Sequence, residues 1–304
     1  MTPADVTPAA EVDIDDALVR ALLAEQHADL AGLPLRLVAS GWDNAIFRLG
    51  EDLAVRLPRR ELGASLVAHE QRWLPSLAPA LPLPVPVPVR VGAPSPALGY
   101  PWSWSVCRWL TGTVALHAAL ADRVDAAVAL GAFVAAMHRP APAGAPHNPW
   151  RGVPLRERTD RLHECLHRVR DDLDGPAIIA LWDELVATPR WTGAPQWVHG
   201  DLHPANVLVD DDGRVCGVID FGDLNAGDPA TDLAIAWMLF GDDDRARAAF
   251  RAAAGVDGDG DTWQRGRGWA LAIGVALVAS SADDEAYTRL GHATISAAVR
   301  GDRS

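Results

Sequence analysis

The sequence of 304 residues contains no lysine, and all 27 of its basic residues are arginines. The 40 acidic residues outnumber them, so the formal net charge is −13. A surplus of negative charge disfavours binding to nucleic acids and to anionic membranes, and it favours cationic partners. A second interpretation, in which the charge only keeps the protein in solution, stays open.

Cysteines and long apolar segments are also scarce. Cys107, Cys165 and Cys216 are odd in number and far apart, which argues against a disulfide framework and against a cysteine-based metal site. The longest apolar run, residues 269–282, is too short to span a bilayer and is typical of a buried helix. The N-terminal residues lack the basic and apolar regions of a signal peptide. We therefore expect a soluble, cytoplasmic protein that does not bind membranes.

Hydrophobic periodicity predicts a small β-rich region followed by a larger helical one. Four runs are typical of strands: 35–40, 44–50, 53–58 and 102–110. Apolar residues recur at helical spacing in four further segments: 64–77, 125–138, parts of 155–187, and 228–240. The proline-rich stretch 81–90 has no basic anchor, so an extended connector is favoured over a polyproline ligand.

The most polar cluster of the chain is HGDLHPANVL, residues 199–208. Taken alone it is compatible with a turn, because His, Asp, Pro and Asn are common turn residues. A predicted hairpin at 207–219 follows it and delivers another carboxylate, Asp220. Phosphoryl transfer needs this set: Asp201 to orient the attacking hydroxyl and accept its proton, and Asn206 and Asp220 to hold Mg²⁺.

Residues 197–234 resemble the catalytic core of the aminoglycoside phosphotransferase family, which shares the protein-kinase-like fold. The resemblance extends to SGWDNAIFRLGEDLAVRLPRR, HEQRWLPSLAP and SVCRWLTG, and so covers residues 35 to 240. It implies an α+β fold of two lobes, a small β-rich N-lobe and a larger, mainly helical C-lobe. The implied boundaries are a loose N-terminal tail at 1–13, a nucleotide-binding N-lobe at 14–107, a hinge at 108–112, and a C-lobe with catalytic loop and acceptor site at 113–304.

The resemblance also implies roles for single residues of the C-lobe. Asp201 matches the catalytic base, and Asn206 and Asp220 match the metal ligands. His199 matches the histidine that braces the catalytic loop, and we expect it to be structural. Asp228 matches an aspartate of a D-P-x-x-D motif and is also typical of a helix N-cap. A supporting role is favoured for it.

In the N-lobe the resemblance implies a nucleotide site. Glu70 matches the glutamate that pairs with the phosphate-binding cation, although a solvated helix charge is the alternative. That cation is Arg56 here, where the family pattern has lysine; arginine keeps the charge but has a different shape. The loop ASGWDNA has a single glycine, so Ser40 and Asn44 are expected to close over the phosphates. The hinge residues that match the purine-contacting segment are Arg108, Trp109 and Leu110.

These features predict transfer of the γ-phosphate of ATP or GTP to a hydroxyl of a small molecule. An aminoglycoside-type antibiotic, inactivated by the transfer, is the first expected acceptor. The alternatives are a macrolide, a choline- or homoserine-type alcohol, or a pseudokinase that is disabled by Arg56 and only binds ligands. Six acidic residues are candidates for contacts to a cationic acceptor, or else are solvated helix faces: Asp160, Glu164, Asp223, Asp283, Asp284 and Glu285.

Overall fold

The structure of the chain is a computed structural model that describes residues 9–41, 43–169, 172–256, 260–281 and 283–302. Residues 1–8 of the predicted tail lie outside these ranges. The chain divides into two compact units: Met1–Pro79, Pro84–Thr111 and Asp220–Gly222 form the first, and Ala80–Leu83, Gly112–Ile219 and Asp223–Ser304 form the second. The boundaries inferred from the sequence stay a prediction. No helix within the described ranges is long and apolar enough to cross a membrane.

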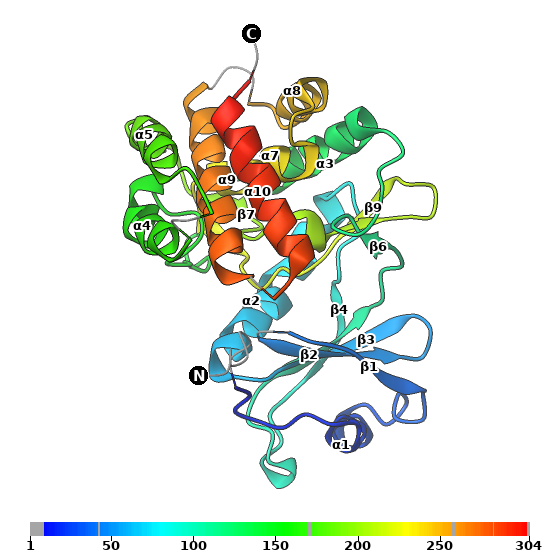
Figure 1. Cartoon of the computed structure of the whole chain (residues 1–304). Coiled ribbons are helices and arrows are strands. Elements are labelled where there is room, and N and C mark those ends of the chain that lie inside the picture. The colour runs from blue at the N-terminus through cyan, green and yellow to red at the C-terminus, as the bar shows by residue number, and fades with distance from the viewer. Residues whose placement is uncertain (1–8, 42, 170–171, 257–259, 282, 303–304) are drawn as a thin grey trace. The chain divides into compact units, whose positions relative to one another are not determined.

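The first unit is built on a five-stranded antiparallel sheet with the order β1-β2-β3-β5-β4 (Figure 1). Its strands are β1 (Leu35–Ser40), β2 (Asn44–Leu49), β3 (Leu53–Pro58), β4 (Pro88–Gly92) and β5 (Trp104–Arg108). The predicted strands 35–40 and 53–58 are confirmed to the residue. The strand predicted at 102–110 is confined to the five residues of β5.

Two helices of the first unit pack on this sheet, α1 (Asp16–Gln26) and α2 (Glu61–Leu77). Alternate residues of a strand point to opposite faces. Val55 and Leu57 of β3 therefore share one face, where they join Leu22 of α1 in a fully buried core. Arg56 points to the other face of the sheet. The short 3₁₀ helices η1 (Ala78–Ala80) and η2 (Pro96–Leu98) complete the local structure.

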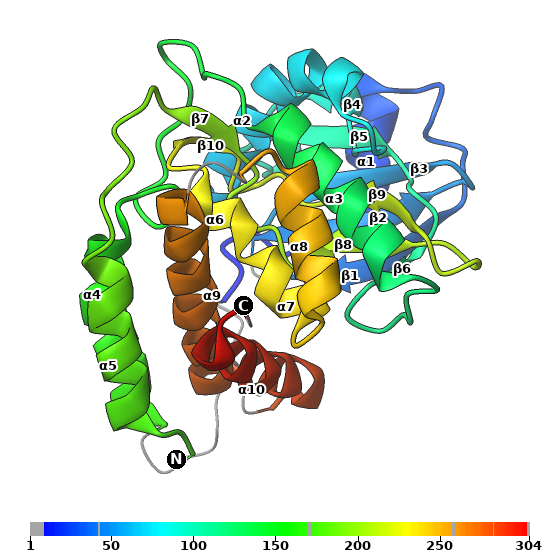
Figure 2. The same ribbon diagram turned by 90° about the horizontal axis from the view of Figure 1, so that it is seen from above.

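The second unit is mainly helical, and α9 lies at its centre. Its helices are α3 (Arg123–Met137), α4 (Thr159–Arg168), α5 (Gly175–Val186), α6 (Ala230–Leu233), α7 (Ile235–Phe240), α8 (Asp244–Ala253), α9 (Gly260–Ser280) and α10 (Glu285–Arg300), with 3₁₀ helices η3 (Leu155–Arg158) and η4 (Pro204–Asn206). Helix α9 packs against α10, and α8 packs along α3 (Figure 2). The apolar run 269–282 falls within α9 up to Ser280. The helix predicted at 228–240 begins only at Ala230 and is divided into α6 and α7.

Short strands of the second unit fix both ends of the segment 199–206. Strand β7 (Gln196–Val198) leads into it and pairs with β10 (Asn225–Gly227). Strand β8 (Val207–Val209) leads out of it and pairs with β6 (Thr113–Val114) and β9 (Val215–Val218). The predicted hairpin is thus confirmed as β8 and β9. A β-rich first unit and a helical second unit confirm the α+β fold class.

Candidate active site

Arg56 on β3 is held by two carboxylates of the first unit. Its Nη1 donates to both carboxylate oxygens of Glu70 on α2, at 2.6 and 2.7 Å, and its Nη2 donates to Asp220 Oδ1 at 2.9 Å. The Arg56 and Glu70 side chains are 11% and 5% exposed. Burial lowers the pKa of Arg56, but the two carboxylates more than offset it and the net pKa is raised. The planar fork of a guanidinium suits two carboxylates in different directions.

An amide from the neighbouring strand completes this cluster. Asn44, the first residue of β2, is buried. With its amide oxygen turned toward β3, it accepts from Arg56 Nε at 3.2 Å and from Nη2 at 3.1 Å. Only the Asn44 Nδ2 then faces away from Arg56. Ser40, at the exposed end of β1, has no hydrogen bond to the cluster among the described residues. The structure therefore brings together four of the predicted residues of this unit and leaves Ser40 apart.

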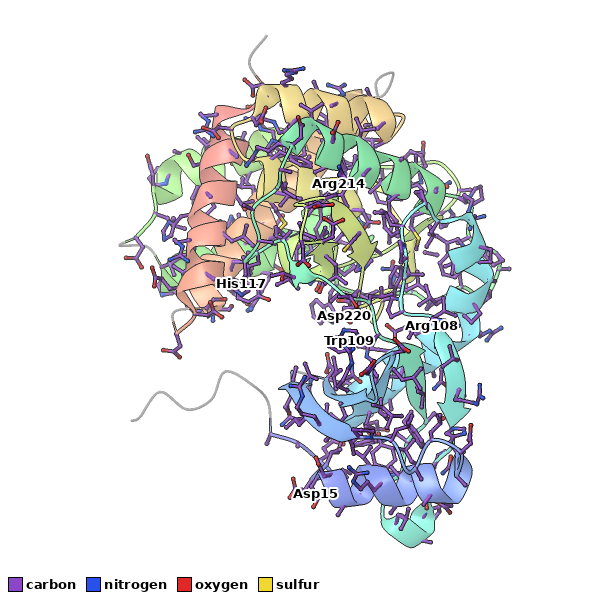
Figure 3. All side chains as sticks on the ribbon, turned by 90° about the vertical axis from the view of Figure 1, so that its right-hand side faces the viewer. Asp15, Arg108, Trp109, His117, Arg214 and Asp220 are labelled. Atoms are coloured by element: carbon purple, nitrogen blue, oxygen red, sulfur yellow. The ribbon has the colours of Figure 1, made fainter. Side chains whose placement is uncertain are left out.

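The predicted purine-contacting segment follows β5, and Arg108 and Trp109 can be followed in Figure 3. Arg108 ends the strand and is exposed. The Trp109 N–H donates to Asp52 O at 2.7 Å, and the Arg48 guanidinium lies over the Trp109 ring, 4.2 Å from its centroid. This amide is therefore engaged within the protein. Contacts of Leu110 and its neighbours to a purine stay a prediction.

Asp220 has an unusual backbone conformation. Its φ of 61° makes it the one non-glycine residue of the described ranges with a positive φ. Aspartate tolerates the left-handed region better than most residues, and such conformations cluster at functional sites. The Asp220 side chain is 54% exposed, and its Oδ1 accepts hydrogen bonds from Arg56 and weakly from the Gly222 N–H at 3.4 Å. Among the described residues no group donates to its Oδ2.

In the second unit, Asp232 on α6 holds the start of the loop 199–206. Its Oδ2 accepts from the His199 N–H at 2.8 Å, and its Oδ1 accepts from the Gly200 N–H at 2.9 Å. Gly200 has φ of 86°, and a Cβ there would lie 2.4 Å from Asp223 O. No other residue fits that position. His199 is fully buried; its Nδ1 accepts from the Asp201 N–H, so its Nε2 is the donor toward Ile219 O at 3.0 Å.

The Asp201 carboxylate has one partner on each oxygen. Arg151 Nη2 donates to Oδ1 at 2.9 Å, and His203 Nε2 lies 3.3 Å from Oδ2. The side chain is still 30% exposed. Burial raises the pKa of this carboxyl, but His203 and Arg151 more than offset it, and the pKa lies well below its usual range. Asp201 is therefore an ionised carboxylate that is suited to orienting a hydroxyl, and is a weak base before bonds begin to change.

Asn206 is buried at the end of η4 and shares the same loop. Its Nδ2 donates to Asp201 O at 2.9 Å, and its own carbonyl accepts from the Ile219 N–H at 2.9 Å. Among the described residues no group donates to Asn206 Oδ1. Because Asp220 directly follows Ile219, the hairpin leads from one predicted metal ligand to the other. Each keeps an unused oxygen.

The chain is similar to known proteins over most of its length. A model of the phosphotransferase enzyme family matches residues 34–269, more than three quarters of the chain. The chain belongs to the phosphotransferase enzyme family. Among curated proteins it is 40% identical to the uncharacterized protein YcbJ of Bacillus subtilis over 57 residues, which are 19% of each chain. The match thus spans about a fifth of that relative's length.

Solved structures of other phosphotransferases share the fold. The GDP complex of aminoglycoside 2′-phosphotransferase-IIIa has a TM-score of 0.67 at 18% identity, over 94% of this chain and 99% of that one. The apoenzyme of macrolide 2′-phosphotransferase MphH from Brachybacterium faecium has a TM-score of 0.57 at 25% identity, over 92% of this chain and 98% of that one. The similarity includes enzymes with two different classes of acceptor.

Asp228 contacts helix α9 and the start of helix α6. Its carboxylate forms a buried ion pair with Arg265 Nε at 2.8 Å, and Arg265 also donates to Thr262 Oγ1 and Pro189 O, each at 2.8 Å. Asp228 Oδ1 accepts from the Ala230 N–H at 3.0 Å, so it also caps the start of α6. This aspartate connects α6 to α9, whereas Asp232 contacts the loop.

Sequence reasoning missed three residues that contact the loop of this phosphotransferase: Arg151, His203 and Asp232. Asp232 is the second aspartate of the same D-P-x-x-D motif in which Asp228 is the first, so the motif itself carried the signal. His203 lies within the quoted polar cluster. Arg151 lies in an irregular segment and had no comparable signal.

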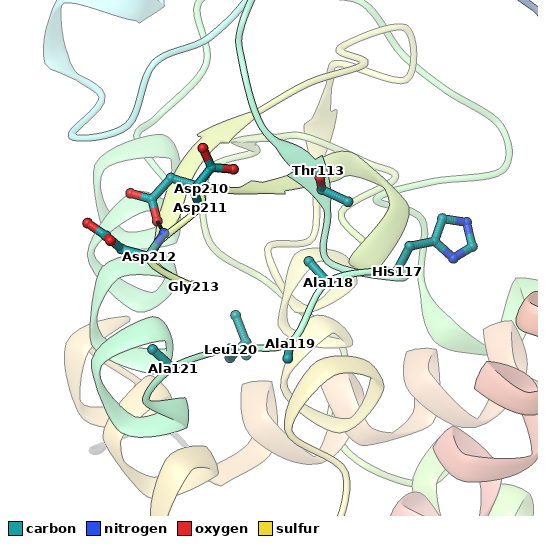
Figure 4. Close-up of a pocket in the computed structure, with 10 residues that line it drawn as sticks. All are labelled: Thr113, His117, Ala118, Ala119, Leu120, Ala121, Asp210, Asp211, Asp212 and Gly213. Carbon is teal, nitrogen blue, oxygen red and sulfur yellow. Dashed lines mark hydrogen bonds between the residues drawn. The ribbon is translucent and has the colours of Figure 1, made fainter.

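One described cavity of the second unit, of about 420 Å³, lies away from these contacts (Figure 4). It is formed by the segment after the hinge and the turn of the β8–β9 hairpin. Its lining residues are Thr113, His117, Ala118, Ala119, Leu120, Ala121, Asp210, Asp211, Asp212 and Gly213. None of the predicted site residues lines it. Asp210 is engaged in the turn, since its Oδ1 accepts from the backbone N–H groups of Asp212 and Arg214.

Proposed function

We propose that this protein transfers the γ-phosphoryl group of ATP or GTP to a hydroxyl of a small molecule. An aminoglycoside-type antibiotic, which the transfer would inactivate, is the first candidate acceptor. The observation that carries the proposal is the loop around Asp201: an ionised, partly exposed carboxylate lies beside an asparagine with an unused amide oxygen, on a backbone held by Asp232. Membership of the phosphotransferase enzyme family supports it.

Asp201 is assigned to the acceptor hydroxyl. A carboxylate with a depressed pKa gains little by removing the proton early. In a loose transition state the transferred group is largely separated from both oxygens, so positioning dominates and the proton moves late. Asp201 therefore accepts a hydrogen bond from the hydroxyl, aligns it, and takes up the proton as the new P–O bond forms.

Asn206 and Asp220 are assigned to Mg²⁺. One carboxylate and one amide oxygen, both unused within the protein, fit an ion that keeps several waters and relies on substrate phosphates for the rest. No group of three His, Cys, Asp or Glu side chains in the described ranges forms an all-protein cage. When bound, Mg²⁺ neutralises charge on the β- and γ-phosphates.

Arg56, Glu70 and Asn44 are assigned to the nucleotide side of the reaction. Glu70 and Asn44 fix the direction of the Arg56 guanidinium, whose nitrogens all have protein partners, so we assign its positive charge, and not direct hydrogen bonds, to the attraction of the phosphates. Ser40 is exposed and is assigned to the phosphate loop together with Asn44. Arg108, Trp109 and Leu110 are assigned to the purine through their backbone.

The pairing of acidic residues within the second unit favours a macrolide as a second candidate acceptor. Asp223 accepts from Asn148 Nδ2 at 2.6 Å and lies 4.0 Å from Arg151 Nε. Glu164 pairs with Arg161 at 3.3 Å. Arg158 has no carboxylate partner in the described ranges, and stacks 5.8 Å from the ring centroids of Trp150 and Trp269. An apolar acceptor with few charges suits these compensated carboxylates and the exposed ring of Trp150.

A phosphorylation assay tests the proposal. The purified protein is incubated with radiolabelled ATP or GTP and with aminoglycosides, macrolides, choline and homoserine, and labelled products are separated. Transfer to one class, abolished in an Asp201→Asn variant, is the expected result. Nucleotide binding without transfer to any acceptor would support the pseudokinase alternative instead.

A further inference from the structure

Arg151 lies in the irregular segment between α3 and η3, with its side chain 23% exposed. Its Nη2 donates to Asp201 Oδ1 at 2.9 Å, and its Nε lies 4.0 Å from Asp223 Oδ2. That Nε is buried without a hydrogen-bond partner. Within the described ranges the hydrogen bond of this guanidinium goes to the carboxylate assigned to the acceptor hydroxyl.

The backbone directly after Arg151 is fixed at Gly152, through both its N–H and its carbonyl group. Gly152 has φ of 67°, and a Cβ there would lie 2.7 Å from Asn225 Oδ1. The Gly152 N–H donates to Thr231 Oγ1 at 3.0 Å, and its carbonyl accepts from the Asp228 N–H at 2.7 Å. The segment is thereby attached to the start of α6, the helix whose Asp232 holds the loop. Arg151 and Asp201 are thus positioned by the same helix.

The opposite oxygen of Asp201 is fixed by an oriented imidazole. His203 Nδ1 accepts from the Ala205 N–H at 3.2 Å, which leaves Nε2 as the donor toward Asp201 Oδ2 at 3.3 Å. With a donor on each oxygen, the plane of the carboxylate is determined. Each oxygen keeps a second lone pair, and the exposed fraction of the side chain shows that one side is open to a ligand.

We propose that Arg151 is a positioning residue for phosphoryl transfer, which holds the Asp201 carboxylate in the orientation that receives the acceptor hydroxyl. The inference rests on the proposed function. It extends that function to a residue which, among the described contacts, touches none of the residues assigned to the nucleotide or to the metal. A displacement of about 1 Å in a reacting group is enough to lower a rate by about 10²-fold. Removing the guanidinium therefore affects turnover more than binding.

The test compares Arg151→Gln and Arg151→Lys with a matched control, Arg214→Gln. Arg214 lies in the turn before β9, and its side chain and that of its ion-pair partner Asp212 are both 76% exposed. For the acceptor that reacts, kcat and KM are measured separately, together with nucleotide affinity and Tm. We expect Arg151→Gln to lower kcat by about 10- to 100-fold with acceptor KM and nucleotide affinity within about threefold. Arg151→Lys recovers part of kcat, and Arg214→Gln matches the parent.

A double-mutant cycle separates positioning from general structural damage. If Arg151 acts through Asp201, then Arg151→Gln has no further effect in an Asp201→Asn background. Multiplying losses in the double variant would overturn the inference, as would an unchanged kcat in Arg151→Gln. A fall in Tm with equal loss of kcat in the Gln and Lys variants also counts against it. If the parent transfers phosphate to no acceptor, the proposed function fails and this inference fails with it.

Discussion

Arg56 in the first unit and Asp201 in the second are two charges of the candidate site, and they are held in different ways. In the first unit Arg56 is surrounded: Glu70, Asp220 and Asn44 together engage all three of its guanidinium nitrogens. In the second unit Asp201 has one donor on each oxygen and remains 30% exposed. All nitrogens of the Arg56 guanidinium have protein partners, whereas part of the Asp201 carboxylate remains accessible to a ligand.

The difference explains how a chain without lysine can use arginine on β3. An ammonium offers three donors from a single point, whereas the guanidinium fork reaches three partners in different directions. Asn44 accepts from Nε and Nη2, positions that lysine does not have. The surroundings of Arg56 are therefore built for arginine, which weakens the pseudokinase alternative raised by this residue alone.

The largest expected effect is at Asp201, the partly exposed carboxylate. Asp201→Ala should lower turnover by at least about 10²-fold, because general-base and orienting contributions are of that order. Nucleotide affinity should stay within about threefold, since Asp201 is assigned to the acceptor. Steady-state kinetics and calorimetric nucleotide titration measure the two effects. Asp212→Ala, at an aspartate whose side chain is 76% exposed in the hairpin turn, is the matched control. Near-parental turnover in Asp201→Ala would remove this residue from the mechanism.

The next largest effect is expected at Arg56. Arg56→Ala should strongly lower turnover and also destabilise the protein by about 3–5 kcal/mol, because Glu70 is left buried and unpaired. Arg56→Lys should retain some activity but not exceed the parent, since Asn44 loses its donors. Initial rates and urea unfolding measure both variants. A lysine variant much faster than the parent would indicate a degraded site and restore the pseudokinase hypothesis.

Asp220 has an observed contact and a proposed one: its Oδ1 accepts from Arg56, and its Oδ2 is the oxygen that we assign to the metal. Asp220→Ala should weaken binding of ATP–Mg²⁺ by about tenfold or more, because a charge-assisted ligand to the ion is lost. The affinity for ATP in EDTA should change much less. Titrations with and without Mg²⁺ give the ratio. Equal losses under both conditions would reduce the role of Asp220 to holding Arg56.

Two aspartates of one motif allow a finer test within the second unit. Asp232→Asn places an amide against two backbone N–H groups, and Asp228→Asn weakens a buried ion pair. Both should lower stability by about 1–3 kcal/mol. Only Asp232→Asn should also lower kcat of the folded enzyme, by about tenfold, since Asp232 holds the loop of Asp201. Equal kcat values for the two variants would contradict this division of roles.

The comparison also shows what a sequence can and cannot predict. The β-like runs predicted the strands around Arg56, because each signal lies within one short segment. The spacing of Asp201, Asn206 and Asp220 predicts a chemistry that stays a prediction. Helix α1 was missed although Val19, Leu22 and Leu23 follow helical spacing.

Contacts between distant segments carried no such signal. Arg151 lies 50 residues before Asp201, in a segment with no periodicity. Asn44 was predicted to contact phosphates, and only the pairing of β2 with β3 reveals that its amide oxygen is near Arg56. In the D-P-x-x-D motif, both aspartates are equally polar, and only packing determines that Asp232 contacts the loop and Asp228 contacts Arg265.

The smallest expected effect concerns the acceptor. The acidic residues considered for a cationic acceptor are mostly engaged within the second unit: Asp223 with Asn148, Glu164 with Arg161, Asp284 as the N-cap of α10 and Glu285 with Arg289. Asp160 and Asp283 are exposed. Arginines compensate three of these charges, those of Asp223, Glu164 and Glu285, so fewer than six carboxylates remain to attract a cation.

For an aminoglycoside we expect KM to rise only about three- to tenfold when ionic strength increases from about 0.02 to 0.2 M, because screening acts on the few acidic groups that stay unpaired. A macrolide carries few charges, so its KM should change by less than about twofold. Measuring KM at both ionic strengths for the reactive acceptor, with kcat as an internal check, separates the two. A reactive aminoglycoside with an unchanged KM would show that charge does not hold it, and recognition would then depend on hydrogen bonds and on the exposed ring of Trp150.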